Sequence, residues 1–353
     1  MIRCRARCAA ALITAVSGCA LIFGSAAAAA PAFAASTTAP PTSGQAAAGW
    51  LARQLVNGNH FVTVYSGTAY PNQGETIDAI FAFAATKSAN HYGARAIRWL
   101  ERPDVLSSYI GSGAESYAGA TAKVALAAEV RGINPARFGT TNLVRRLGKL
   151  LTKAGRYSDH SQYGDFSNAF SQSLAIIALT RHGRAPARAV SFLVSSECKN
   201  GGFPLNFGQK TCVSDTDSTA MDVQALLAAG GHRAAAVRGL TWLKRVQHPG
   251  GGLDASGATK PNANTTGLAG EAFAAARWFR NAALAAKFLR GLQLGCSAKS
   301  SRRGAIAYDS MGFAKSTAID ATAQGILGLA DVSLAGLSAS GSSYGALRLA
   351  CAS

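Results

Sequence analysis

The chain has 353 residues, 48% of them hydrophobic, a length that suits one large domain or two. With 35 lysines and arginines against 17 acids, its net charge of +18 favours anionic partners such as a wall polymer, an acidic polysaccharide or an anionic lipid. The basic residues are scattered, so a solubilising role on an Ala-rich surface is the competing explanation. After the N-terminal segment no apolar run is long enough to span a membrane, which argues against an integral membrane protein.

The N-terminal segment predicts export. Three arginines within residues 1–8 precede an apolar run over residues 9–23, and a stretch of small residues follows and ends at Ala34. This order is typical of a secretory signal peptide, residues 1–34, and the apolar run is too short for a stable membrane helix. Its removal takes away three arginines and no acid, so the net charge falls from +18 to +15. Because an exported chain is kept apart from nucleic acid, we expect no such partner.

Residues 16–19, Val-Ser-Gly-Cys, resemble a bacterial lipobox, in which Cys19 would carry a lipid. The apolar stretch continues past Cys19 to Phe23, whereas a lipobox should end it. We therefore expect a secreted or cell-surface protein, with a lipid anchor on Cys19 as the less favoured alternative. Residues 35–45 are rich in Pro, Thr, Ser, Gly and Ala and predict a short flexible linker.

Residues 46–353 predict a single domain of six repeats, each of about 47 residues. A large side chain followed by leucine recurs on a helical background at Trp50-Leu51, Trp99-Leu100, Arg146-Leu147, Phe192-Leu193, Trp242-Leu243 and Phe288-Leu289. Successive leucines of these pairs lie 49, 47, 46, 50 and 46 residues apart. A period this constant indicates a repeat architecture.

Each repeat contains two helices of different character. The first carries the leucine pair and is apolar on one side, and a Gly-rich turn such as residues 200–203 follows. The second is apolar nearly all round, as in residues 219–229, 265–276 and 317–330. A helix that is apolar on all sides is buried on all sides. The alternation predicts an all-α (α/α)6 toroid, with inner helices around a central cavity, and residues 61–65 are expected to form an extended loop.

Four cysteines follow the leader: Cys198, Cys212, Cys296 and Cys351. An even number in an oxidising compartment predicts two disulfides. Of the three possible pairings we favour Cys198–Cys212, which closes a short loop, and Cys296–Cys351, which would fasten the last residues to the body of the domain. We expect no metal site and no cofactor, because Cys and His are not clustered at ligand spacing.

Several segments together resemble a known superfamily. Residues 238–247, with the Gly-rich turn at 250–253, resemble the QW repeat of squalene cyclases, except that Leu253 stands where that motif has tryptophan. Phe288-Leu289 with Gln293 is a second, partial copy, and Glu197 stands where the fourth repeat would have glutamine. Over essentially the whole domain the chain is similar to the terpenoid cyclase and protein prenyltransferase α/α toroids. The resemblance implies the fold and leaves the activity open.

Residues 215–220, Asp-Thr-Asp-Ser-Thr-Ala, resemble the DxDD-T-A motif of class II terpene cyclases, whose protonated middle aspartate starts cyclisation. The matching residue is Asp217, with Asp215 as its neighbouring acid. Such chemistry needs adjacent carboxyl groups, because the charge of one raises the pKa of the other. Ser218 replaces the last aspartate of the motif, and the chain has one barrel where squalene cyclases have two, which weakens the implied activity.

Asp217 also has a structural explanation, because aspartate is a preferred helix N-cap. Asn264 and Asp320 occupy the aligned position in the fifth and sixth repeats, and Glu75 falls within one residue of it in the first. The same alignment would place these four residues around one rim of the toroid. Because a polar rim over an apolar cavity is typical of a ligand site, we expect Glu75, Asn264 and Asp320 to bind ligand.

The sequence supports two functions. The one it favours is an exported, non-catalytic toroid that binds a wall polymer, a lipid or a small apolar ligand through its cavity and rim. The alternative is an acid-catalysed enzyme of terpene-cyclase or glycan-cleaving type that uses Asp217, assisted by Asp215. Burial of Asp217 beside another carboxyl group in an apolar cavity would favour the enzyme, whereas its use as a helix cap would favour the binding protein.

Overall fold

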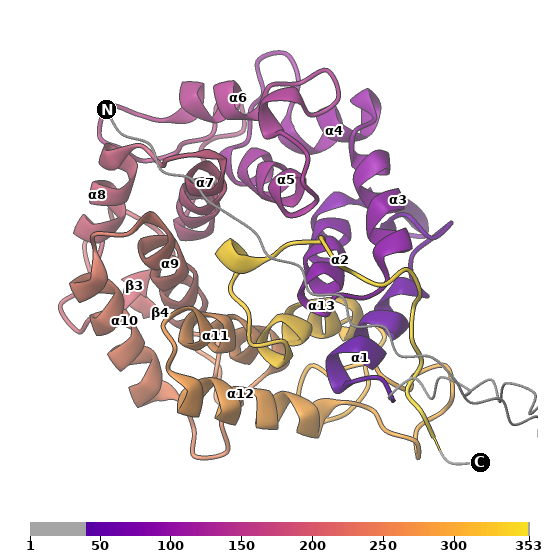
Figure 1. Ribbon diagram of the computed structural model, residues 1–353. Helices are drawn as coiled ribbons and strands as arrows, with labels where there is room; N and C mark the ends of the chain where they lie inside the picture. Colours follow the sequence, from indigo (N-terminus) through magenta and orange to yellow (C-terminus); the bar gives the residue numbers. More distant parts are fainter. Residues whose placement is uncertain (1–39, 352–353) are drawn as a thin grey trace, which may run out of the picture. The chain divides into compact units, whose positions relative to one another are not determined.

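The computed structural model describes residues 40–351, which form two concentric layers of helices (Figure 1). The expected leader, with Cys19, and residues 35–39 of the expected linker lie outside the described residues. The first helix, α1, begins at Ser43, within the segment expected to be a linker, and Thr42 caps it. None of the described helices is long and apolar enough to cross a membrane.

Six helices form the inner layer: α2 (Gln73–Ala85), α5 (Ala118–Val130), α7 (Ala169–His182), α9 (Thr216–Ala229), α11 (Ala263–Ala275) and α13 (Ala318–Leu329). Each packs against the next, and α13 packs against α2, so the inner ring is closed. Six others surround it: α1 (Ser43–Ala52), α3 (Asn90–Leu100), α6 (Leu143–Leu150), α8 (Ala187–Ser195), α10 (Arg233–Val246) and α12 (Phe279–Leu292). The predicted (α/α)6 toroid is therefore confirmed.

The smaller elements lie in the connections and in the C-terminal segment. The connections hold α4 (Pro103–Ile110), η1 (Pro135–Arg137), the hairpin β1 (Phe61–Tyr65) and β2 (Thr68–Asn72), and the short pair β3 (Phe203–Pro204) and β4 (Ser214–Asp215); η2 (Leu334–Gly336) follows the last helix. The expectation of a loop at residues 61–65 was wrong. That segment pairs antiparallel with β2, because Ser66 and Gly67 both adopt positive φ and close a two-residue turn.

The recurring leucines hold the two layers together. All six lie on outer helices and are completely buried: Leu51, Leu100, Leu147, Leu193, Leu243 and Leu289. Burying a leucine side chain contributes roughly 1.5–3 kcal/mol to the free energy of folding. The sequence period therefore reflects one repeated contact between an outer helix and the inner ring.

The glutamines of the QW-like segments link neighbouring outer helices. The Gln247 side-chain amide donates to the carbonyl oxygens of Gly251 at 3.0 Å and Asn281 at 3.1 Å. Gln293 donates in the same way to Ser43 at 2.8 Å, which ties the last repeat to the first. In the fourth repeat Glu197 takes this place and accepts two hydrogen bonds from Arg238 of the next outer helix.

The C-terminal strap, residues 331–351, closes one end of the toroid, and Figure 1 shows η2 over the middle of the ring. Its backbone bonds the C-terminal ends of inner helices: Ala339 N–H donates to the Val130 carbonyl at 2.8 Å, and Arg181 donates to the Ala335 carbonyl. Cys296–Cys351 fastens its last residue, and Cys198–Cys212 is the second disulfide, so the favoured pairing is confirmed.

Candidate functional site

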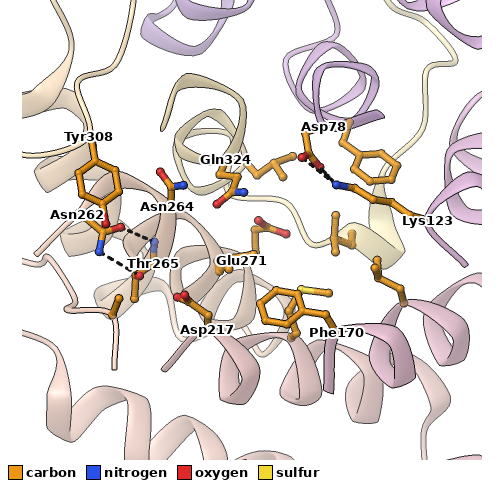
Figure 2. A pocket seen from close by; sticks show the side chains of 17 residues that line it. Asp78, Lys123, Phe170, Asp217, Asn262, Asn264, Thr265, Glu271, Tyr308 and Gln324 are labelled. Atoms are coloured by element: carbon orange, nitrogen blue, oxygen red, sulfur yellow. Dashed lines mark hydrogen bonds and ion pairs between the residues drawn. The ribbon is translucent and has the colours of Figure 1, made fainter. Parts of the chain in front are cut away.

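A cavity of about 340 Å³ lies inside the inner ring, and all six inner helices contribute to its wall. Most of its surface is apolar: Phe81, Phe170, Leu174, Met221, Leu268, Leu327 and, from the C-terminal strap, Leu334. The polar side chains in the same wall are labelled in Figure 2. Nine of the seventeen lining residues are polar, so the cavity combines apolar surface with many groups that can form hydrogen bonds or ionise.

The capping explanation for Asp217 was wrong. The N-cap of α9 is Asp215, whose carboxylate accepts a hydrogen bond from Ser218 N–H at 2.7 Å. Asp217 comes two residues later and lines the cavity. Asp215, expected to assist catalysis, does not appear among the cavity residues, although its charge still acts on Asp217.

The same holds for the aligned residues of the other repeats. Asn262 caps α11 and Asn72 caps α2, while α13 begins after Thr317, so the cap always precedes the expected rim residue. Asn264 lines the cavity together with Asp217. Glu75 and Asp320 do not line it directly; they lie beside the Asp78–Lys123 pair, which does.

A buried threonine fixes the start of four inner helices. Each hydroxyl accepts a hydrogen bond from a backbone N–H in the segment before the helix: Thr76 from Phe61, Thr219 from Phe203, Thr266 from Leu253 and Thr322 from Ile306. The threonine of the DxDD-T-A-like segment, Thr219, is therefore structural. It holds the first turn of α9 and so directs Asp217, two residues earlier, toward the cavity.

The Asp217 carboxyl group has a raised pKa. Its Oδ1 is buried and has no hydrogen-bond partner among the described residues. Burial raises the pKa of Asp217 to about 6, against a hydrogen bond with Thr265 that lowers it, and the charge of Asp215 adds to the rise. A carboxylic acid with a pKa near 6 can act as a proton donor in mildly acidic or neutral solution.

Across the cavity, Asp78 of α2 and Lys123 of α5 form an ion pair at 2.8 Å (Figure 2). Burial has the largest single effect and lowers the pKa of Lys123, but the charge and hydrogen bond of Asp78, with Tyr109 and Asp320, together outweigh it, and the pKa is raised. Burial and the charge of Asp320 raise the pKa of Glu75 to about 7, and burial also raises the pKa of Asp320. Three carboxyl groups thus share one ammonium group here.

Glu271 on α11 was missed by the sequence analysis. It lines the cavity, is completely buried, and neither of its carboxyl oxygens has a hydrogen-bond partner among the described residues. Burial raises its pKa well above the ordinary value. The sequence did contain a signal: Glu271 is an acid within a helix that is otherwise apolar all round, seven residues after Asn264 and hence on the same face.

Within residues 40–351 no group of three or more potential ligand side chains is arranged to hold a metal ion.

No family model matches the sequence, and no curated protein matches it either. Solved structures of the same fold do. A type II terpene cyclase from Scytonema, bound to geranylgeranyl dihydroxybenzoate, has a TM-score of 0.61 at 13% identity over 83% of this chain and 96% of its own.

Two further structures cover similar shares. A protein from Actinoplanes gives a TM-score of 0.58 at 15% identity, over 82% of this chain and 98% of its own. The unsaturated glucuronyl hydrolase from Bacillus sp. GL1 gives 0.56 at 12% identity, over 81% and 95%. At these identities the likeness establishes the α/α toroid fold alone.

Proposed function

We propose that the protein is an enzyme that protonates a small, mainly apolar substrate, with Asp217 as the acid. The observation that carries the proposal is the environment of Asp217: it lies in the cavity wall, its Oδ1 is buried and unpaired, and burial raises its pKa to about 6. A protonated carboxyl group facing an apolar cavity can donate its proton to a carbon–carbon double bond or an ether oxygen.

The composition of the cavity favours a terpenoid type of substrate over a glycan. Nine of the seventeen lining residues are polar, but the larger part of the exposed wall is apolar and comes from leucine, phenylalanine and methionine. A sugar would need a hydrogen-bonding partner for most of its hydroxyl groups. The volume of about 340 Å³ falls at the lower end of the range for small-molecule sites. One relative in fold is a terpene cyclase and another a glucuronyl hydrolase, so both chemistries are compatible with the toroid.

The test compares the oxidised protein with an Asp217→Asn variant after exposure to lipid and cell-wall extracts. Native mass spectrometry identifies the molecule that is retained and whether its mass or structure changes. We expect conversion by the unaltered protein, and retention without conversion by the variant, because asparagine keeps the shape of the side chain and cannot donate a carboxyl proton. Asp104→Asn, at an exposed aspartate paired with Arg102, is the matched control.

The pH dependence gives a second check. Because the protonated form is active, conversion should fall as pH rises through about 6. Thr265→Val removes the hydrogen bond that lowers the pKa of Asp217, so the fall should move to higher pH. Retention of the ligand without conversion by both proteins would instead establish the non-catalytic binding toroid.

For the wider setting we infer export through the leader at residues 1–34, followed by a toroid domain at 46–353. Two disulfides support folding in an oxidising compartment.

A lipid is the anionic partner that the surface favours. The inner helices all run in the same direction, since an outer helix separates each from the next, and the loops before them meet at the end opposite the strap. Large exposed apolar side chains gather on four of these loops: Val64, Tyr65, Tyr70, Tyr163, Phe166, Val213 and Met311. Exposed aromatic residues on a basic protein suit the interface of an anionic membrane.

A further inference from the structure

Glu271 is the one fully buried acid in the cavity wall, and the acid step assigned to Asp217 leaves it without a role. It lies seven residues beyond Asn264 on α11, two turns deeper and about 10 Å further along the helix. Figure 2 shows its carboxyl group in the middle of the cavity, between Asp217 and the Asp78–Lys123 pair. It therefore faces whatever molecule fills the cavity.

The neighbouring polar groups are engaged elsewhere or are themselves incomplete. Lys123, the cation in the described cavity wall, is held by Asp78 at 2.8 Å. Gln224 accepts a hydrogen bond from the strap at Leu334 N–H, 3.0 Å. Its amide nitrogen lies near enough to Glu271 to lower the pKa of that carboxyl group, but no hydrogen bond joins the two side chains. A buried carboxyl group without a partner costs folding free energy, and such groups persist where a ligand satisfies them.

The charge balance indicates what that ligand carries. Five of the 17 acids of the chain lie on or beside the cavity: Glu75, Asp78, Asp217, Glu271 and Asp320. Of its 35 lysines and arginines, Lys123 alone lines the described wall. A strongly basic protein thus has an acidic interior, which opposes an anionic ligand and leaves a cation as the complementary group.

We propose that the cavity binds a small, mainly apolar amine whose ammonium group donates to the Glu271 carboxylate. This deepens the proposed function by naming the class of substrate, and it rests on that function for the identity of the site. An ammonium group at Glu271 would place the apolar remainder along the leucine and phenylalanine wall toward Asp217. The proton balance is simple: burial raises the pKa of Glu271 in the empty cavity, and the proton that the carboxyl group holds passes to solvent when the ammonium group binds.

The probes are geranylamine, geraniol and geranate, which share one apolar chain and differ in charge. Isothermal titration calorimetry at pH 7.5, in phosphate and in Tris, measures affinity and proton release together. We expect the amine to bind most tightly and to release protons on binding, because burial raises the pKa of Glu271 and a bound ammonium group lowers it again. Glu271→Gln should weaken the amine at least tenfold, abolish the release and leave geraniol unchanged.

Asp78, Lys123 and Asp217 line the same cavity, and Gln224 also acts on Glu271, so the assignment needs a second variant. Asp217→Asn should keep the binding and the proton release of the amine; their loss there but not in Glu271→Gln would overturn the proposal. Equal or tighter binding of geraniol or geranate, or no binding of the amine, would overturn it too. Glu101→Gln, on the outer side of the ring, is the matched control. Conversion of substrate is not needed for any of these outcomes, so this proposal and the acid function of Asp217 can fail separately.

Discussion

Asp217 gives a test at the scale of one residue that needs no ligand. Its pKa is about 6 in the folded chain and 3.8 without the protein environment, so the folded state holds the proton more tightly. The contribution of Asp217 to the free energy of unfolding is then greatest at pH below about 4 and is lost as pH rises through about 6. We expect Asp217→Asn to be more stable than the unaltered protein at pH 8, by on the order of 2 kcal/mol, and equal to it near pH 3.5.

Urea unfolding at both pH values measures this difference. Asp104→Asn should gain no stability at either pH, because Arg102 lowers the pKa of Asp104 where burial raises that of Asp217. A loss of stability in Asp217→Asn at pH 8 would show that the carboxylate is well paired in the fold, contrary to the site described above.

The repeat alignment predicted where residues such as Asp217 and Asn264 lie, but not their surroundings. Position follows from the period, because four of the six repeats build the same first turn around a buried threonine. Ionisation depends on neighbours from other repeats: Thr265 acts on Asp217, and Asp320 acts on Glu75. Glu271 escaped notice because nothing local distinguishes an orphaned acid from a paired one.

At the scale of helices, the small residues of the inner ring set how closely two helices approach. A Cβ added to Gly267 of α11 would lie 2.4 Å from the Gln324 carbonyl oxygen of α13, too close for an unstrained contact. We expect Gly267→Ala to lower the free energy of unfolding by about 1–3 kcal/mol or more. Gly148→Ala, on outer helix α6 with open space around it, should raise stability by up to about 1 kcal/mol.

Thermal unfolding of the two variants separates packing from helix propensity, since both make the same chemical change. Equal thermal unfolding of the two variants would mean that α11 and α13 can move apart at no cost in free energy.

The inner helices were predictable because a helix apolar on all sides has to be buried. The β1–β2 hairpin was not, because its strands are mostly exposed and the pairing depends on the turn at residues 66–67.

At the scale of the whole molecule, the sequence period predicted the ring but not the C-terminal strap that covers one end of it. Closure follows from the repeats themselves. The Gln293 side chain donates a hydrogen bond to Ser43 of the first outer helix, as Gln247 does to Asn281 of the outer helix that follows it. The strap has no counterpart in the repeats, so only the pairing of Cys296 with Cys351 indicated that the C-terminal residues return to the body. That Leu334 forms part of the cavity wall required the structure.

The disulfide of the strap should keep the strap in place over one end of the cavity, in addition to stabilising the fold. Cys296 and Cys351 are 55 residues apart, and chain entropy predicts a loss of about 4 kcal/mol when the bond is removed; the 14-residue separation of Cys198 and Cys212 predicts about 3 kcal/mol. The two double serine variants should therefore unfold with similar ease. They should differ locally, because only one of the bonds fastens the strap.

Hydrogen exchange followed by mass spectrometry reads this out at the Ala339 amide, which donates to Val130 at 2.8 Å, and along the rest of the strap. We expect Cys296→Ser/Cys351→Ser to speed exchange in the strap under native conditions, while Cys198→Ser/Cys212→Ser leaves it slow. Gly49→Ala should act like the first variant with the disulfide intact, since its Cβ would lie 1.6 Å from the Leu347 carbonyl oxygen. Unchanged exchange in both would mean that the hydrogen bonds at Val130 and Lys87 hold the strap without the disulfide, and that the cavity stays closed at this end in a reduced chain.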